Sequence, residues 1–265
     1  MNVKDKLVLV TGASAGMGMN AAKSFAKAGS KVILLARRKD KLEKVSEEIQ
    51  AGGGRAYVYD CDLLDQESIV NVVSKIKTEL GVPDIIINNA GYGEWKYLDE
   101  TNDQEIVSYM HVPTFVAMFI TRYFLPEMLE RNTGSIVNVT SPMSYLICPG
   151  ATAYITARFA LRGFYEALKA DLANTNITVS LLVAGLVLDS EYWQTNPDSL
   201  NKIPKIARLL VPNLSSENAG KKMVQIVEKE KSLMITPFML RTVFWQLAIA
   251  PMVVQWLMRV TGHKR

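Results

Sequence analysis

The stretch Leu7-Val8-Leu9-Val10-Thr11-Gly12-Ala13-Ser14-Ala15-Gly16-Met17-Gly18 decides the fold of this chain. Its apolar first half predicts a buried strand, its glycines predict a tight turn, and the residues from Gly16 to about Gly29 predict a helix. Gly12 allows the backbone to reverse, Gly16 lets main-chain amides approach a ligand, and Gly18 allows the helix to pack closely on the strand. A helix N-terminus offers unpaired N–H groups and a positive dipole end, so the stretch predicts a pyrophosphate site.

The same stretch allows a second interpretation. Gly12-Ala13-Ser14-Ala15-Gly16 matches the pattern around the nucleophile of serine hydrolases. Such a serine needs a histidine base placed later in the chain. The sequence holds two histidines, His111 and His263, and the second lies in the basic C-terminal end. We therefore prefer the pyrophosphate site and keep a Ser14 hydrolase as an alternative.

Composition limits the class of protein. A chain of 265 residues can form one large domain that buries about 70–75% of the surface of its unfolded form. It is 49% hydrophobic and 21% charged, as globular proteins are, and a scattered net charge of +4 predicts no nucleic-acid surface. Cys61 and Cys148 show no redox or metal spacing, so we expect a reducing, cytoplasmic compartment and no metal site. The segment 1–6 leads at once into the first strand, so we expect no signal peptide or N-terminal anchor.

Strand-like and helix-like runs alternate along the chain. After the first strand, strands are predicted at 31–36, 56–59, 84–88, 135–140, 178–183 and 233–235, and helices at 16–29, 39–51, 65–80, 102–131, 152–174 and 216–230. Short β-branched runs that are each followed by an amphipathic helix predict an α/β fold, a doubly wound parallel sheet with helices on both faces. No linker divides the chain, so we expect a single domain over 1–265.

The end of the second strand indicates the kind of dinucleotide. An NAD site places a carboxylate here for the ribose 2′-hydroxyl, whereas an arginine accommodates a 2′-phosphate. Positions 36 and 37 hold no acid, and Arg37 and Arg38 follow the strand. The sequence therefore predicts NADP(H), and a solvated charge pair that opens the next helix is the alternative.

Polar side chains also follow later strands. Asp62 follows the third strand and Asn88-Asn89-Ala90-Gly91 ends the fourth, and open α/β sheets bind ligands beyond these strand ends. Tyr154 and Arg158 lie one helical turn apart and share a face. A cation ~4 Å away favours the phenolate of a tyrosine, which allows it to exchange a proton near neutral pH.

These motifs, in this order and spacing, resemble the short-chain dehydrogenase/reductase family over about residues 5–235. They are Thr11-Gly-x-x-x-Gly16-x-Gly18, Asn88-Asn89-Ala90-Gly91, Ser141 and Tyr154-x-x-x-Arg158. The resemblance implies a Rossmann-like fold with a seven-stranded sheet, a nicotinamide cofactor, and hydride exchange between an alcohol and a carbonyl. It also implies a homodimer or homotetramer.

The resemblance assigns roles by position. Tyr154 would be the general acid/base, and Ser141 would hold the carbonyl oxygen. Asp62 would contact the adenine, and the backbone of Val187 would hold the carboxamide. The expected cofactor-binding residues are Gly12, Ser14, Gly16, Met17, Gly18, Arg37, Arg38, Asp62, Leu63, Asn89, Ala90, Tyr154, Arg158 and Val187.

Three positions depart from the family pattern. Arg158 replaces a lysine, and it keeps the charge but does not give up a proton. His111 replaces a catalytic asparagine, and it is either a proton shuttle, and so a fourth catalytic residue, or a core histidine. Pro113 lacks an N–H, which keeps a kink at this point of the helix. Asp189 replaces a threonine near the expected diphosphate. These changes motivate an alternative function, a catalytically impaired dinucleotide-binding sensor or scaffold.

The substrate side is rich in apolar residues. The predicted pocket wall consists of Tyr92, Trp95, Met143, Tyr145 and a substrate-side insertion over 186–211 that carries Tyr192 and Trp193. Such a wall favours a lipophilic ketone, aldehyde or alcohol, although the same residues could simply form core. We therefore expect an NADP(H)-dependent carbonyl reductase or alcohol dehydrogenase.

An apolar C-terminal extension over 237–265 ends the chain. Residues 242–258 carry no charge and lie between Arg241 and Arg259. The run is shorter than the ~20 residues of a bilayer span, and Pro251 interrupts it. Two uses stay open: covering the pocket or a subunit face, and peripheral membrane contact through tryptophans and the basic end, which are Trp245, Trp256, Lys264 and Arg265.

Overall fold

In the computed structural model, which describes residues 1–210 and 212–263, seven parallel strands form one sheet of order β3-β2-β1-β4-β5-β6-β7. The order reverses between β1 and β4, so the sheet has the switch point of a Rossmann-like fold. The strands are β1 Leu7–Thr11, β2 Lys31–Ala36, β3 Arg55–Asp60, β4 Ile85–Asn88, β5 Gly134–Thr140, β6 Ile177–Ala184 and β7 Leu233–Thr236. The predicted fold class is confirmed.

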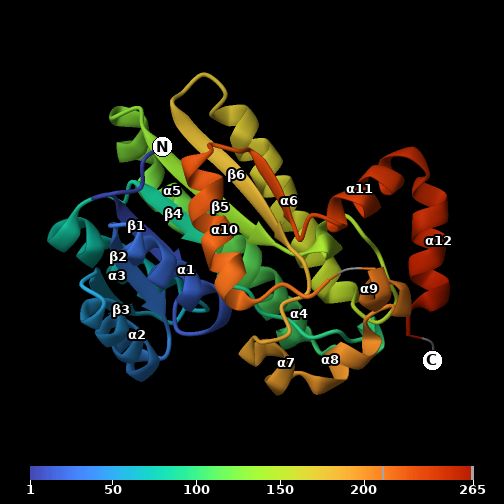
Figure 1. Ribbon diagram of the computed structural model, residues 1–265. Helices are drawn as coiled ribbons and strands as arrows, with labels where there is room; N and C mark the ends of the chain where they lie inside the picture. The colour runs from blue at the N-terminus through green and yellow to red at the C-terminus, as the bar shows by residue number, and fades with distance from the viewer. Residues whose placement is uncertain (211, 264–265) are drawn as a thin grey trace.

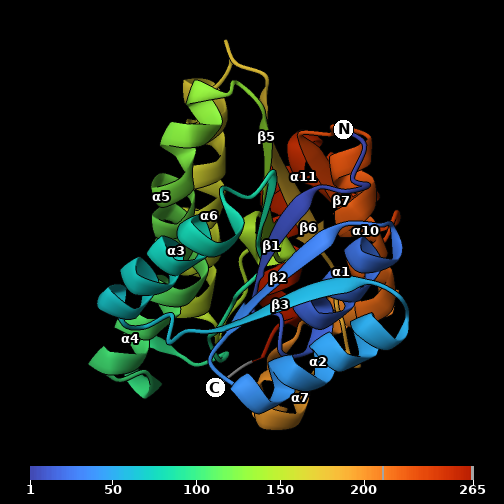
Figure 2. The same ribbon diagram turned by 90° about the vertical axis from the view of Figure 1, so that its left-hand side faces the viewer.

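Helices cover both faces of the sheet, as Figures 1 and 2 show. One face carries α1 Gly16–Lys27, α2 Lys39–Ala51 and α10 Ser216–Glu228; the other carries α3 Gln66–Leu80, α4 Asp103–Met110, α5 Val116–Glu130 and α6 Thr152–Asp171. Because both faces are covered, every residue of β1, β4 and β5 is buried. Separate apolar clusters on the two faces form the core.

The long helix predicted over 102–131 is divided. Pro113 has no N–H, so the α-helical hydrogen bond to the carbonyl of Tyr109 cannot form, and the chain makes a π-helical turn over His111–Phe115. The buried hydroxyl of Thr114 donates to the carbonyl oxygen of Ala157 at 3.0 Å. The turn is therefore attached to α6, the helix that carries Tyr154.

The remaining helices lie at one end of the molecule. Between β6 and α10 the chain forms α7 Glu191–Thr195, α8 Pro197–Lys202 and α9 Lys205–Leu210, and after β7 it forms α11 Leu240–Ile249 and α12 Pro251–Thr261. Figure 1 shows α11 and α12 side by side at the right-hand end. Pro251 begins α12, which explains why the uncharged run 242–258 makes two helices. Among the described residues, no helix has the length and hydropathy to cross a membrane.

Helix α10 packs directly on the backbone of α1. A Cβ added to Gly220 would lie 2.5 Å from the backbone carbon and oxygen of Asn20 and 2.7 Å from the nitrogen of Ala21. These distances are too short for any side chain. Because Gly220 has no side chain, α10 can lie this close to α1, the helix that follows the glycine turn.

This contact leads to a prediction about stability. Gly220→Ala should lower the free energy of unfolding by about 1–3 kcal/mol, because backbone must move to admit the methyl group. Gly163→Ala is the matched control, since Gly163 lies in α6 with nothing within 4 Å of an added Cβ. The control should be neutral or stabilising by up to ~1 kcal/mol. Urea unfolding of both variants measures this, and equal stability of the two would contradict the close packing.

Candidate active site

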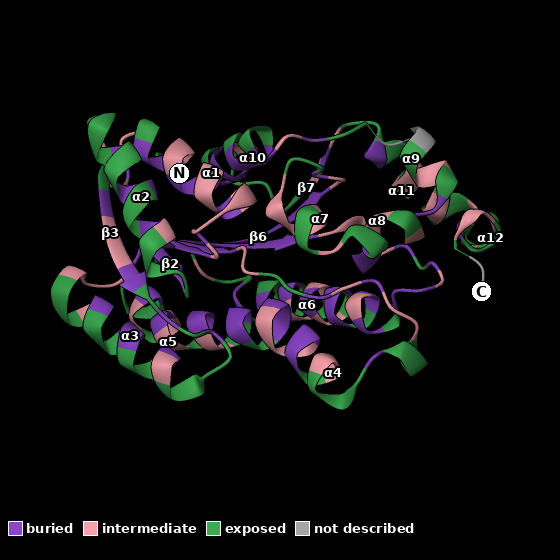
Figure 3. Ribbon diagram, turned by 90° about the horizontal axis from the view of Figure 1, so that it is seen from below, coloured by how far each residue is buried: buried purple, intermediate pink, exposed green. Residues whose placement is uncertain are grey.

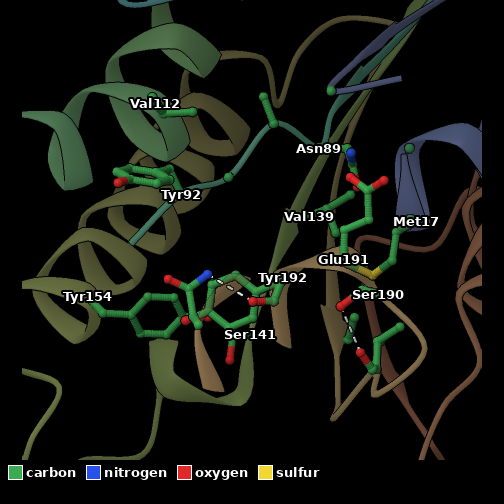
Figure 4. Close-up of a pocket in the computed structure, with 18 of the residues that line it drawn as sticks. Met17, Asn89, Tyr92, Val112, Val139, Ser141, Tyr154, Ser190, Glu191 and Tyr192 are labelled. Carbon is green, nitrogen blue, oxygen red and sulfur yellow. Dashed lines mark hydrogen bonds between the residues drawn. The ribbon is translucent and has the colours of Figure 1, made fainter. Parts of the chain in front are cut away.

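A cleft of about 800 Å³ opens at the carboxyl ends of the strands. Ser141 and all of the residues expected to bind the cofactor line it, whereas His111 does not. Figure 4 shows Tyr154, Ser141 and Tyr192 at one end of the cleft, and Met17, Asn89 and Glu191 at the other. The predicted residues are thus brought together, and their contacts with a cofactor stay a prediction.

The glycine turn after β1 has room for an anion. Gly12 and Gly16 have φ of 69° and 54°, values that L side chains rarely adopt. A Cβ on Gly18 would lie 2.2 Å from the carbonyl oxygen of Gly12, so helix and turn touch through backbone alone. No side chain caps the N-terminus of α1, and its first turn holds no acid. Its N–H groups therefore fit a phosphate of a dinucleotide.

Thr11 connects this turn to the end of β4. Its hydroxyl oxygen accepts from the N–H groups of Asn89 and Ala90 at 3.0 and 2.9 Å. The side-chain amide of Asn89 donates to the carbonyl of Thr11 at 3.0 Å. The Oδ1 atom of Asn89 is buried and has no hydrogen-bond partner among the described residues. A bound ligand with a donor group fits that atom.

A cationic rim lies where the adenosine end is expected. Arg38 donates to the Ser14 hydroxyl at 3.2 Å and pairs with Glu191 at 2.9 Å, and Lys41 pairs with the other oxygen of Glu191. The hydrogen bond from Lys41 holds the pKa of Glu191 below its ordinary value, and Arg38 adds to this effect. Arg37 has no hydrogen bond or ion pair to another described residue. The positive charge of Arg37 is therefore available to a phosphate group.

Arg158 is a buried cation without a counter-ion. Its side chain is 8% exposed, its Nε atom has no partner, and no described residue forms an ion pair with it. Its guanidinium carbon lies 4.7 Å from the ring centroid of Tyr154. A Cβ on Gly91 would lie 2.9 Å from Nη2, so the glycine makes room for the guanidinium. Because a buried unpaired charge is unfavourable, the site fits a ligand that supplies oxygen acceptors.

Ser141 follows β5 and begins a short 3-10 helix over Pro142–Ser144. Its hydroxyl oxygen accepts from the N–H of Met143 at 3.3 Å, while its carbonyl accepts from the N–H and hydroxyl of Ser144. These contacts orient the side chain and use only its acceptor capacity. The hydroxyl proton of Ser141 is therefore available to a substrate oxygen.

The structure does not bring His111 to the cleft. Its ring packs against those of Phe115 and Phe119, with centroids 5.9 and 6.0 Å away. The neighbouring Val112 lines the cleft instead. The expected proton shuttle through the imidazole therefore finds no support in this geometry. His111 is instead the first residue of the π-helical turn.

Asp189 has a structural partner. Its two carboxylate oxygens accept from the N–H of Ser216 at 2.9 and 3.0 Å, and one also accepts from the Ser216 hydroxyl. That hydroxyl in turn accepts from the side chain of Asn20 at 3.0 Å. The carboxylate therefore caps the beginning of α10 and does not line the cleft, which explains the acid at this position.

The segment after β6 closes the substrate end. The hydroxyl of Tyr192 donates to the carbonyl of Gly93 at 2.7 Å, and the indole N–H of Trp193 donates to the carbonyl of Val187 at 2.8 Å. Burial raises the pKa of Tyr192, so its hydroxyl stays a donor. The apolar lining here includes Trp95, Met143, Leu146, Ile203 and Leu240.

Tyr145 was expected in this wall, but it lies outside the cleft. Its ring packs 4.7 Å from the ring of Phe244, and the guanidinium carbon of Arg162 lies 4.0 Å from its centroid. Sequence reasoning also missed Glu191, whose pairing with Arg38 and Lys41 joins α7 to the rim. No local signal points to it, because its partners lie 150 residues or more away.

Comparison with known proteins identifies the family. Residues 6–200 match the short chain dehydrogenase family, and the chain belongs to it. The chain is 29% identical over 269 residues to a dehydrogenase/reductase SDR family protein 7-like from Anopheles gambiae, covering 99% of this chain and 85% of that one. It is 32% identical over 237 residues to a fatty acyl-CoA reductase of Acinetobacter baylyi, covering 89% and 77%. It spans only 56–60% of the length of several other curated relatives.

Solved structures share the fold. A short-chain dehydrogenase from Sphingobium yanoikuyae in complex with NADPH superposes with a TM-score of 0.81 at 20% identity, covering 94% of each chain. A short chain dehydrogenase/reductase from Burkholderia phymatum in complex with NAD also has a TM-score of 0.81 at 20% identity, covering 94% of this chain and 96% of that one. These structures therefore support the fold of the chain, and the family match supports its class.

The cap at Asp189 leads to a prediction. Asp189→Ala should lower the free energy of unfolding by about 1–2 kcal/mol, because the N–H of Ser216 loses its acceptor. Asp198→Ala is the matched control, an exposed acid of α8 without a hydrogen bond to a described residue, and it should change stability by less than ~0.5 kcal/mol. Thermal unfolding of both measures the difference. Equal effects would show that the Asp189 cap does not stabilise the fold.

Proposed function

We propose that this protein interconverts a lipophilic ketone or aldehyde and its alcohol by direct hydride transfer with NADP(H). One observation carries the proposal: the buried guanidinium of Arg158 lies against Tyr154 in a cleft that also holds Ser141 and the glycine turn. The tyrosine is thus placed beside a cation, and the turn offers a phosphate site in the same cleft. Membership of an oxidoreductase family supports this reading.

The rim favours NADP(H) over NAD(H). No carboxylate stands at positions 36 and 37 for a ribose 2′-hydroxyl, and Arg37, Arg38 and Ser14 lie together at the cleft. A 2′-phosphate carries negative charge that two guanidinium groups and a hydroxyl can receive. Related structures hold NADPH in one case and NAD in another, so the preference rests on these residues.

The chemistry divides between cofactor and protein. A nicotinamide dinucleotide held by the glycine turn and the rim would supply hydride-transfer chemistry between the carbonyl and alcohol carbons. In reduction, Ser141 donates a hydrogen bond to the carbonyl oxygen, and Tyr154 gives its phenolic proton to that oxygen as the C–H bond forms. Arg158 stabilises the phenolate that results. The phenolate then regains a proton from solvent, because Arg158 gives none up and His111 lies outside the cleft.

The substrate end favours apolar compounds. Trp95, Met143, Leu146 and Trp193 line it, and Tyr192 has its hydroxyl engaged by Gly93. An apolar wall with few free polar groups favours substrates that bury hydrocarbon surface against it. One relative carries the name fatty acyl-CoA reductase, which accords with a lipophilic substrate.

The cofactor preference can be tested by binding. Arg37→Ala and Arg38→Ala should each weaken NADPH binding about tenfold or more, because a charged hydrogen bond contributes ~1.5–3 kcal/mol. NADH binding should change little. Lys44→Ala is the control, since Lys44 is an exposed cation of α2 that does not line the cleft. Isothermal titration calorimetry measures all four proteins. Tighter binding of NADH than NADPH by the native protein would contradict the assignment.

The proton donor can be tested by turnover. Tyr154→Phe should lower kcat by roughly 10²–10⁴-fold, since the general acid is lost. Arg158→Ala should lose activity, because no cation then stabilises the phenolate of Tyr154. Arg158→Lys keeps the charge and should be at least as active as the native chain.

The same variants separate enzyme from sensor. NADPH oxidation is followed with a panel of hydrophobic carbonyls, and thermal unfolding shows that each variant is folded. If the native protein binds NADPH yet reduces nothing, and Arg158→Lys is equally inactive, a dinucleotide-binding sensor or scaffold replaces the enzyme. This second function is motivated by an arginine at position 158, where the family resemblance predicts a lysine.

A further inference from the structure

The last two helices expose an unusual amount of apolar surface. We call it the tail face, and it consists of residues of these helices together with the two residues before α11: Phe238, Met239, Trp245, Ile249, Met252, Val253 and Trp256. Met252 is 85% exposed, and Trp245 and Trp256 are 68% and 53% exposed. Figure 3 shows α11 and α12 with mostly intermediate and exposed residues, unlike the buried strands. Several exposed large apolar side chains within one short segment indicate an interaction surface.

The tail face is distinct from the side on which these helices pack. In α11, Leu240, Val243, Phe244 and Leu247 face the protein at helical spacing, while Trp245 and Ile249 face away. In α12, Val254 and Met258 are buried, and Met252, Val253 and Trp256 are exposed. Each helix thus has one apolar side that the core covers and a second apolar side that no described residue covers.

The charges within the segment that carries the tail face have one sign. From Phe238 to the end of the chain there is no aspartate or glutamate, and the cations are Arg241, Arg259, Lys264 and Arg265. Lys264 and Arg265 lie outside the described residues. Neither Arg241 nor Arg259 forms an ion pair with a described residue. Tryptophan beside arginine on an apolar helix is the composition that binds the headgroup region of anionic membranes.

We propose that the tail face docks on the surface of an anionic phospholipid membrane. A second copy of the chain is the less favourable occupant, because a two-fold contact would bring two positive faces together. Helices of 10 and 11 residues are too short to cross a bilayer, which needs ~20, so they lie in the plane of the interface. Trp245 and Trp256 enter the headgroup region, and the arginines face lipid phosphates.

Docking would place the cleft beside the lipid. Leu240 of α11 lines the cleft, and Val254 and Met258 of α12 pack in one cluster with Trp95 and Met143 of its wall. The membrane and the substrate end thus contact opposite sides of the same two helices. The docking itself depends on no cofactor or substrate, so it stands or fails separately from the proposed function.

Vesicle flotation of the full chain, without cofactor, tests the proposal. The vesicles are phosphatidylcholine alone or phosphatidylcholine with phosphatidylglycerol. Native protein should float with the anionic vesicles, and salt should weaken this binding. Arg241→Gln with Arg259→Gln should reduce binding roughly 25-fold, about fivefold for each charge near an anionic surface. Trp245→Ser with Trp256→Ser should reduce it at least as much.

Matched controls separate the tail face from surface properties in general. Val70→Ser with Leu129→Ser removes two exposed apolar side chains of α3 and α5, and Lys39→Gln with Lys44→Gln removes two exposed cations of α2. Both should float as the native chain does. Light scattering gives the mass of each protein in solution.

Three outcomes would overturn the proposal. The first is native protein that ignores anionic vesicles. The second is equal binding to neutral and anionic vesicles with no effect of the arginine changes. The third is a native dimer that Trp245→Ser with Trp256→Ser converts to monomer while neither protein floats, which would make the tail face a subunit contact.

Discussion

The site depends on how closely the backbone at Gly18 approaches the turn at Gly12. Because no Cβ stands between them, the N-terminus of α1 reaches the end of β1 and its N–H groups face the cleft. Thr11, one residue earlier, binds the backbone of Asn89 and Ala90 and so fixes the end of β4 against the same turn. The cleft is therefore positioned by main-chain packing, and the side chains that line it are placed on a rigid support.

Arg158 places a positive charge beside Tyr154. Its guanidinium is bulky, and Gly91 leaves the necessary space. The price is a buried cation that the protein alone does not neutralise. In the free protein the buried guanidinium lacks hydrogen-bond acceptors. A ligand whose oxygen atoms approach it supplies them, and this contributes to the binding free energy of the ligand.

Sequence predicted the features that depend on local pattern. The strands, the glycine turn and the gathering of Asn89, Ser141 and Tyr154 follow from hydrophobic runs and from the common edge where parallel strands end. The positions that differed depend on contacts remote in sequence or on helical phase. Widening of the helix into a π turn changes the direction of the side chains, so Val112 faces the cleft and His111 faces phenylalanines.

The pairing of Glu191 with Arg38 and Lys41 has a thermodynamic consequence. This carboxylate occupies two cations at the rim while its helix, α7, belongs to the segment that covers the substrate end. A phosphate that arrives at Arg38 competes with Glu191 for the same positive charge. By linkage, the effect is mutual. The free energy that holds α7 to the rim lowers the binding free energy of the anion, and a bound anion weakens the attachment of α7 by the same amount. Because both ion pairs are partly exposed to solvent, this coupling between the rim and α7 is weak.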